Sequence, residues 1–208
     1  YALQKRIEIG YEEIPEVLKN AIIATEDPRY YKHNGIDFIG ILRAAREDLR
    51  LGKGAKLHGG STISQQLIRT ILLHRGQTIR RKLKEVILSI RLERHYSKEE
   101  ILTLYCNQFN LGHGAYGVEA AAQLYFEKNA RDLNLVEAAL ITGIFRGPSV
   151  YSPYRRPELT MNRRNHVLNR MRDEGYITPQ ECDEGKLQPL GVLPLYRSNS
   201  DHAAYFKE

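Results

Sequence analysis

Residues 58–66 read His58-Gly59-Gly60-Ser61-Thr62-Ile63-Ser64-Gln65-Gln66, and a cationic stretch follows them, Arg80-Arg81-Lys82-Leu83-Lys84-Glu85. Residues 75–94 hold seven basic and two acidic side chains, a local charge of +5 in a chain whose formal net charge is +6. Positive charge concentrated in this way attracts anions, and a phosphate-rich partner is one interpretation. The other interpretation is a solvated helix face that binds no ligand.

The composition favours a globular chain with an acidic partner. With 208 residues and 42% apolar content, the sequence suits one domain, or one domain with a small lobe. A pI near 9.3 points to nucleic acid, anionic lipid or a phosphorylated substrate. Cys106 and Cys182 indicate neither a disulfide nor a zinc site. No apolar run predicts a membrane span, and the start at Tyr1 without Met suggests an excised piece whose targeting segment is missing.

The hydrophobic pattern predicts a mainly α-helical fold with a short strand near each end of the chain. Proline, glycine and capping residues place helices at about 15–27, 37–52, 61–73 and 78–96, with further helices beginning at Ser97, Asn134 and Thr178. The glycine-rich residues 52–60 are expected to be flexible, and they lack the spacing of a nucleotide P-loop.

Two of the expected helices carry an apolar stripe beside many cations. Helix 37–52 could lie on an anionic membrane, but a core-facing helix is favoured. Its stripe consists of Phe38, Leu42, Ala45 and Leu49. The stripe of helix 78–96 is expected to be buried, and it consists of Ile79, Leu83, Val86, Ile87 and Ile90.

Two carboxylates stand in unusual positions. Glu26 lies at a helix end beside a second acid and before a proline, whereas Glu85 lies within the cationic stretch. Such a pair suits glycosyl transfer at an anomeric carbon, where one group takes a proton from the attacking hydroxyl and the other lies near the leaving group. Cations around Glu85 imply an anionic leaving group such as a diphosphate. The alternatives are ordinary ion pairs, of Glu26 with Arg29 or Lys32 and of Glu85 with Arg81.

Several polar residues near these acids also have plain structural roles. His33 fits a loop hydrogen bond more readily than a ligand site. Ser61, Thr62 and Ser64 fit helix caps, and Gln66 fits an exposed surface.

Four motifs in order resemble the peptidoglycan glycosyltransferase family, the domain of class A penicillin-binding proteins and of monofunctional transglycosylases. The first three motifs are residues 26–37, 59–66 and 81–85. The fourth comprises Glu100-Ile101-Leu102, Tyr105, Asn107, Gly112, Gly117-Val118-Glu119-Ala120-Ala121 and Tyr125-Phe126. Any one motif could arise by chance, whereas four in the family's order over about residues 15–175 are highly specific.

The resemblance implies a lysozyme-like head with a smaller membrane-proximal jaw subdomain. It makes residues 1–195 the glycosyltransferase domain, with a flexible loop at about 52–60. Residues 196–208 become a linker toward a missing transpeptidase domain. The enzyme is expected at the outer (periplasmic or extracellular) face of the bacterial cytoplasmic membrane, anchored by a segment absent from the sequence. No nucleic acid partner is expected.

In the implied reaction, lipid II is the acceptor and a growing glycan on a polyprenyl diphosphate is the donor. Inversion at the MurNAc carbon gives a β-1,4 link, with Glu26 as general base on the GlcNAc 4-hydroxyl and Glu85 assisting departure of the diphosphate. The resemblance assigns substrate contacts or support to Asp27, His33, Ser61, Thr62, Gln66, Arg69, Arg81, Lys82 and Lys84. No cofactor or metal site is obligatory, although a divalent cation such as magnesium often assists. Moenomycin is expected to compete at the donor side.

The sequence departs from the family pattern at a few positions. Tyr30 stands for the usual Phe, Gln77 for a common Arg and Thr103 for Glu. Arg69 replaces the usual Lys, which keeps the charge but alters the donor geometry. Two other functions stay open: a lytic, lysozyme-type hydrolase, which needs no diphosphate site, and a non-enzymatic module for anionic lipid or nucleic acid.

Overall fold

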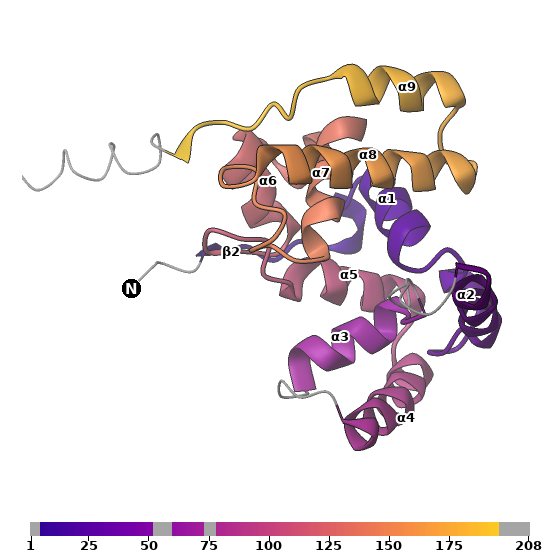
Figure 1. Cartoon of the computed structure of the whole chain (residues 1–208). Helices are drawn as coiled ribbons and strands as arrows, with labels where there is room; N and C mark the ends of the chain where they lie inside the picture. Colours follow the sequence, from indigo (N-terminus) through magenta and orange to yellow (C-terminus); the bar gives the residue numbers. More distant parts are fainter. Residues whose placement is uncertain (1–4, 52–59, 73–77, 196–208) are drawn as a thin grey trace, which may run out of the picture.

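The computed structural model describes residues 5–51, 60–72 and 78–195, and the chain in these ranges is mainly helical (Figure 1). The expected loop at 52–60, apart from Gly60, and the expected linker at 196–208 lie outside the described residues. The nine α-helices of the described ranges are α1 (Glu16–Glu26), α2 (Phe38–Leu51), α3 (Ile63–Leu72), α4 (Ile79–His95), α5 (Lys98–Gln108), α6 (Val118–Phe126), α7 (Leu135–Phe145), α8 (Pro157–Asp173) and α9 (Pro179–Leu187). Short 3-10 helices lie at Tyr11–Glu13, Tyr30–Lys32 and Ala130–Asp132.

Two short strands form a parallel pair, β1 (Lys5–Arg6) with β2 (Ala115–Tyr116). The strand expected near the N-terminus is therefore confirmed, but its partner comes from the middle of the chain. The glycines at 112, 114 and 117 have positive φ, which turns the chain sharply enough to bring β2 beside β1. No strand is found near the end of the described chain, where Leu193 N donates a hydrogen bond to Tyr125 O instead.

The expected helix limits are confirmed by the caps. Ser97, Asn134 and Thr178 each form a capping box, in which the cap side chain accepts from the backbone three residues on and a glutamate returns the bond. Thr78 accepts a hydrogen bond from the backbone N–H of Arg81. Helix α1 ends at Glu26, two residues before the break at Pro28.

The core holds α1 firmly in the body of the molecule. The main cluster joins α1, α3, α5, α6 and α7 and includes Leu18, Ile22, Leu67, Ile101, Tyr105, Leu140 and Ile144. A second cluster joins α1 to α7, α8 and α9 through Ala21, Ala24, Ala139, Val167, Leu168, Met171 and Cys182. Alanines at these contacts let the helix backbones approach closely, so the C-terminal end of α1 is fixed on several sides.

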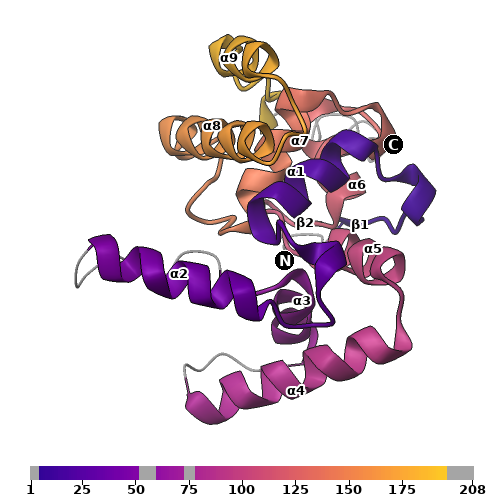
Figure 2. The same ribbon diagram turned by 90° about the vertical axis from the view of Figure 1, so that its right-hand side faces the viewer.

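Helices α2, α3 and α4 form a separate side of the molecule. In Figure 2, α2 and α4 extend away from the body toward the same side, and α3 lies between them near the body. Helix α3 packs on both α4 and α5, so it connects this side to the core.

The expected burial of the α4 stripe is wrong for Ile79, Leu83 and Ile87, whereas Val86 and Ile90 are half-buried. Ile79 and Leu83 are 91% and 59% exposed, and the buried residues of α4 are Glu85 and Ser89. The reason is the loop before α2, whose Gly35 has φ +92° and lies so close to α4 that a Cβ atom would stand 2.8 Å from the carbonyl carbon of Ser89. This contact places the face of α4 that carries Glu85 and Ser89 against the protein and leaves Ile79, Leu83 and Ile87 exposed.

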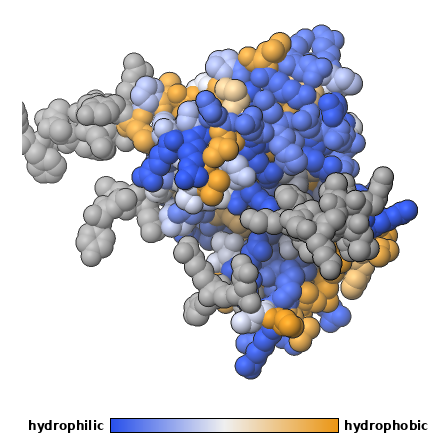
Figure 3. Space-filling model, viewed as in Figure 1, coloured by the Kyte–Doolittle hydropathy of each residue, from blue (hydrophilic) through white to orange (hydrophobic). Residues whose placement is uncertain are grey.

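The core-facing prediction for α2 is also wrong where its side chains are described. Phe38 and Leu42 are 74% and 72% exposed, whereas Ala45 and Leu49 lie outside the described side chains. Figure 3 shows hydrophobic side chains gathered at the lower right, where Figure 1 places α2 and α4. We call the exposed residues Phe38, Ile39, Leu42, Ile79, Leu83 and Ile87 the apolar edge.

Arg164 is a fully buried cation that donates to three main-chain carbonyls and to the side chain of Asn165. Its guanidinium donates to Lys186 O, Gln188 O and Pro189 O at 2.7–3.1 Å. Arg164→Met should lower the free energy of unfolding by about 3 kcal/mol or more, because three carbonyls lose a charged donor. Urea denaturation measures this loss. Arg172→Met on the same helix is the control, since its exposed pair with Asp173 contributes little, and equal losses from the two variants would contradict the assignment.

Candidate active site

Glu26 is a buried carboxylate with two partners from distant helices. It is 8% exposed, and its Oε2 accepts a hydrogen bond from Gln66 Nε2 on α3 at 3.0 Å. Its Oε1 lies 3.4 Å from Arg163 Nη2 on α8. The alternative pairing with Arg29 or Lys32 is therefore wrong.

The partners of Glu26 are themselves held in place. Gln66 is buried rather than exposed, and its Oε1 accepts from the hydroxyl of Tyr105 at 3.2 Å. Burial raises the pKa of Tyr105 well above its usual value, and the nearby Glu26 adds to this, so the hydroxyl stays a donor. Burial lowers the pKa of Arg163, while Glu26 acts in the opposite direction. The carboxylate thus sits in a fixed, largely dry frame.

Asp27 joins the loop after α1 to the start of α3. Its Oδ2 accepts from the backbone N–H of Ile63 at 3.0 Å, and its Oδ1 lies 2.9 Å from His33 Nε2. The other ring nitrogen, His33 Nδ1, lies 4.0 Å from Glu93 Oε1 on α4. Asp27 and His33 therefore tie together the elements on both sides of Glu26, which fits the support expected of them.

Glu93 completes this chain of contacts, and the sequence reasoning gave it no role. It accepts a hydrogen bond from the hydroxyl of Ser64 and pairs with Lys98 Nζ at 2.6 Å. Lys98 also lies 4.4 Å from the ring centre of Tyr30, and its backbone oxygen accepts from the Tyr30 hydroxyl at 2.7 Å. The hydroxyl that distinguishes Tyr30 from the usual Phe is thus used in this contact.

Glu85 occupies a second buried position. Its Oε1 accepts from Lys82 Nζ at 2.6 Å, and Lys82 Nζ also donates to Ser61 Oγ at 3.1 Å. Pairing of Glu85 with Arg81 is wrong, since Lys82 is the partner. Within the described residues, Glu85 Oε2 and Arg81 Nε are buried without a hydrogen-bond partner. A buried acid holding an exposed ammonium beside a hydroxyl can present positive charge to an anion.

Both carboxylates are connected by hydrogen bonds to the segment that begins α3, Glu26 directly and Glu85 through Lys82. Ser61 contacts Lys82 at the start of this segment, and Gln66 contacts Glu26 further on. Thr62 is buried and donates to Gly35 O at 2.8 Å, so it acts within the frame. Of the other expected substrate contacts, Arg69 on α3 is half-buried and Lys84 on α4 is exposed.

The structure adds Arg163 and Glu93 to the expected site. Arg163 lies on a polar helix with four arginines, 137 residues after Glu26, and no spacing in the sequence distinguishes it from its neighbours. Glu93 could have been suspected, because it is one of only two acids in the strongly basic residues 75–94.

The sequence pattern described as Transglycosylase matches residues 2–172. The chain belongs to the transglycosylase family. This transglycosylase domain is 47% identical over 190 residues to penicillin-binding protein 1A of Aquifex aeolicus. The matched region covers 91% of the chain and 26% of that protein. It is 45% identical over 192 residues to penicillin-binding protein 1A of Escherichia coli, which covers 92% of the chain and 22% of that protein.

A solved structure supports the same relationship. The transglycosylase domain is similar to penicillin-binding protein 1A from Haemophilus influenzae, with a TM-score of 0.56 and 28% identity over 91% of this chain and 18% of that chain. The chain is thus a mainly helical transglycosylase enzyme domain, similar to part of penicillin-binding proteins 1A. It spans about a quarter of the length of these curated relatives. Within the described ranges, none of its helices has the length and apolar character that crossing a membrane requires.

Proposed function

We propose that this domain polymerises lipid II into β-1,4 glycan strands, with inversion at the MurNAc anomeric carbon and release of polyprenyl diphosphate, in bacterial cell wall synthesis. One observation carries the proposal: the segment at the start of α3 contacts Glu26 through Gln66 and the Lys82–Glu85 pair through Ser61. A carboxylate and a cationic group on one short segment suit a reaction that takes a proton from one sugar while an anion leaves the other.

In the proposed mechanism Glu26 takes the proton from the GlcNAc 4-hydroxyl of the acceptor. Gln66 and Arg163 fix the direction of its carboxylate, and correct placement of a base is what makes proton transfer effective. The acceptor oxygen then forms its bond to the MurNAc anomeric carbon as the bond to the diphosphate breaks. Attack from the face opposite the leaving group inverts the anomeric carbon.

The leaving diphosphate is proposed to bind beside Lys82, Arg81 and Ser61. The ammonium of Lys82 is exposed, and its attraction for the diphosphate grows as negative charge develops on the leaving oxygen. Glu85 is buried behind Lys82 and holds it in place, so its proposed contribution passes through that lysine. Lys84 and Arg69 would add to the positive field.

The rival functions differ in what they make from lipid II. This chain, supplied with lipid II in a detergent micelle, should give glycan polymer and release one polyprenyl diphosphate for each glycosidic bond that forms. It should leave a finished glycan uncut. Cleavage of finished glycan would favour the lytic hydrolase, whereas binding of liposomes without polymer under any condition would favour a non-enzymatic module.

The apolar edge supports a position at a membrane surface, with α2, α3 and α4 as the proposed jaw beside a lysozyme-like head. Its apolar side chains lie beside the many cations of α2 and α4, a combination that suits an anionic bilayer. The proposed location is the outer face of the bacterial cytoplasmic membrane, anchored by a segment outside this sequence. The proposal also keeps residues 1–195 as the glycosyltransferase domain. It keeps residues 196–208 as a linker toward a transpeptidase domain.

Phe38→Ser/Leu42→Ser should weaken binding to vesicles of anionic phospholipid by tenfold or more, since burying each side chain contributes about 1.5–3 kcal/mol. Vesicle sedimentation measures the binding. Leu187→Ser is the control, because this residue is 86% exposed on α9, away from the apolar edge. Equal binding by wild type and the double variant would contradict the membrane assignment.

A magnesium ion is compatible with the proposed chemistry but has no evident protein site. Among the described residues, no three His, Cys, Asp or Glu side chains gather so that they could hold a metal ion. The residues therefore do not fit a dedicated site, and no step above passes through a metal. Assistance by magnesium remains a proposal without residues assigned to it.

A further inference from the structure

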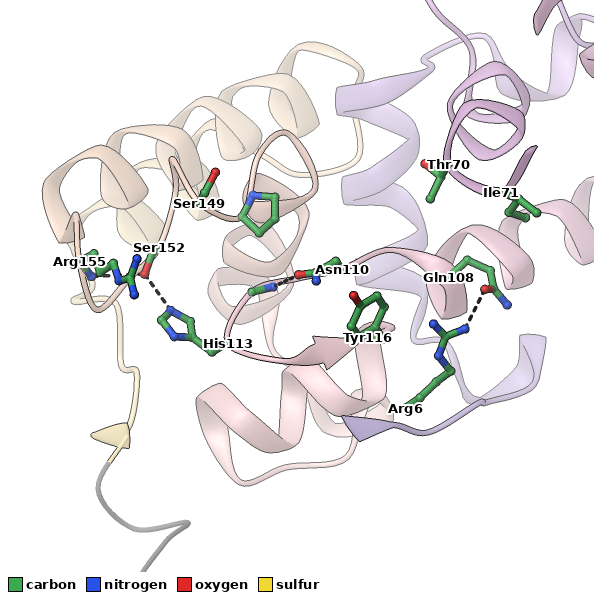
Figure 4. A pocket seen from close by; sticks show the side chains of 12 residues that line it. Arg6, Thr70, Ile71, Gln108, Asn110, His113, Tyr116, Ser149, Ser152 and Arg155 are labelled. Atoms are coloured by element: carbon green, nitrogen blue, oxygen red, sulfur yellow. Dashed lines mark hydrogen bonds between the residues drawn. The ribbon is translucent and has the colours of Figure 1, made fainter. Parts of the chain in front are cut away.

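A cavity of about 850 Å³ lies at the far end of α3 from Ser61 (Figure 4). Thr70 and Ile71 of α3 line one part of it, and the residues around β2 and the loop before α8 line the rest. Figure 4 shows Arg6 and Arg155 at opposite ends of this cavity, with Asn110 and Tyr116 between them. No residue assigned above to the reaction lines it.

The cavity lining is cationic and holds no acidic residue. Among the described residues, the guanidinium of Arg6 contacts uncharged groups alone, Gln108 Oε1 at 3.1 Å and the ring of Tyr116 at 4.9 Å from its centre. Within the described residues, the side chain of Arg155 has no hydrogen-bond or ion-pair partner. Two guanidinium groups without a carboxylate at the edges of one cavity suit an anionic ligand, and their planar forks suit a carboxylate.

His113 adds an uncharged polar group between the two arginines. Its Nε2 lies 2.9 Å from Ser152 Oγ. Partial burial lowers the pKa of His113, and the positive charge of Arg155 lowers it further. The imidazole is therefore mainly neutral at pH 7. With Gln108 and Asn110 it offers hydrogen bonds to an extended polar chain, so the lining suits a peptide as well as its carboxylate.

The order of contacts along α3 relates this cavity to the proposed reaction. The diphosphate position lies at Ser61, before α3, and Glu26 contacts Gln66 in the middle of the helix. Thr70 lies one turn further, about 6 Å along the axis, and its hydroxyl donates to Gln66 O at 2.9 Å. The cavity therefore lies beyond Gln66 along α3 as seen from the proposed diphosphate position at Ser61.

We propose that this cavity binds the peptide stem that the growing glycan carries, with Arg6 and Arg155 at its two ends each binding a carboxylate of that peptide. The inference rests on the proposed function, because it needs a peptide-bearing glycan as donor. Sugar hydroxyls give no reason for two unpaired guanidinium groups, whereas a peptide carboxylate does. Arg6 and Arg155 are thus specificity-determining residues for the peptide and take no part in the transfer itself.

The test compares Arg6→Gln/Arg155→Gln with wild type on two substrates. One is lipid II with its complete pentapeptide, and the other is the same lipid, diphosphate and disaccharide with a methylamide in place of the peptide. The variant should raise the KM for the peptide-bearing substrate by about tenfold or more, since it loses charge-assisted hydrogen bonds. Its KM for the methylamide substrate should stay within about twofold of wild type.

A second double variant controls for net charge, and thermal unfolding checks that both variants fold. Arg131→Gln/Arg172→Gln removes two exposed arginines outside the cavity and should leave both KM values unchanged. Equal KM increases for both substrates, or no increase for either, would overturn the peptide site. Absence of polymer from wild type with both substrates would instead refute the proposed function, and this inference with it.

Discussion

Glu26→Gln should reduce polymerisation of lipid II by about 10²–10⁴-fold, the usual contribution of a general base. The amide keeps the shape of the carboxylate and can still accept a hydrogen bond from Gln66, but it cannot take a proton from the acceptor hydroxyl. Because the pair with Arg163 is lost, a modest decrease in stability is expected as well. The rate of polymer formation from labelled lipid II measures the main effect.

The control for this prediction lies on the same helix. Glu16 is at the exposed start of α1, where it pairs with Lys19 at 2.8 Å, and Glu16→Gln should leave the rate unchanged. The melting temperature and the binding of moenomycin should show that Glu26→Gln still folds and retains its donor side. Turnover by Glu26→Gln within a few-fold of wild type would remove Glu26 from the mechanism.

Lys82→Ala should lower kcat/KM for lipid II by about 100-fold, well beyond the effect of Lys84→Ala. Lys82 is held by the buried Glu85 and by Ser61, whereas Lys84 has no such contact among the described residues. Losing a preorganised cation from a leaving-group site costs about 10²–10³ in rate. Removing the ammonium also leaves the Glu85 carboxylate buried without its partner, which lowers stability.

A salt series separates the two lysines further. Lys84→Ala removes a screened surface charge, so its small effect should vanish as ionic strength rises. The defect of Lys82→Ala should persist, because a held cation beside a buried acid is screened less. Equal defects for the two variants at every salt concentration would contradict the diphosphate assignment. In that contradicting case, Glu85→Gln should also behave like wild type, because Glu85 is proposed to act through Lys82.

The helix limits were predictable because they depend on local chemistry. Capping residues such as Ser97 and Thr178 satisfy the first backbone N–H groups of their own helices, and Pro28 ends α1 wherever that helix packs. The position of Glu26 at a helix end was predictable on the same basis. These features need no knowledge of distant contacts.

Burial of α2 and α4 was not predictable from periodicity, because both helices have two plausible inner faces. The apolar stripe of α4 follows the spacing of a buried helix face, yet the close approach of Gly35 to Ser89 turns the polar face inward. The sequence shows that residue 35 is a glycine, but it shows neither the positive φ of this residue nor its close contact with α4. The exposed stripe becomes intelligible if a bilayer rather than the protein core covers it.

The partner of Glu26 also depended on a tertiary contact, whereas Lys82 lies only three residues before Glu85 on α4 and was a local alternative to Arg81. Sequence proximity suggested Arg29 for Glu26 and Arg81 for Glu85, but the structure pairs them with Arg163 and Lys82. Arg163 comes from α8, which the second core cluster brings against α1. Ion pairs across such a distance in sequence follow from packing and cannot be read from local spacing.

The most direct test of the account is the anomeric configuration of the bond that this chain forms from α-linked lipid II. With Glu26 as base and the Lys82–Glu85 pair at the leaving group, the product should carry only β-1,4 links, detected by the anomeric coupling in its NMR spectrum. An α-linked product, or a sugar covalently attached to Glu26 or Glu85 in mass spectra of the working enzyme, would contradict it.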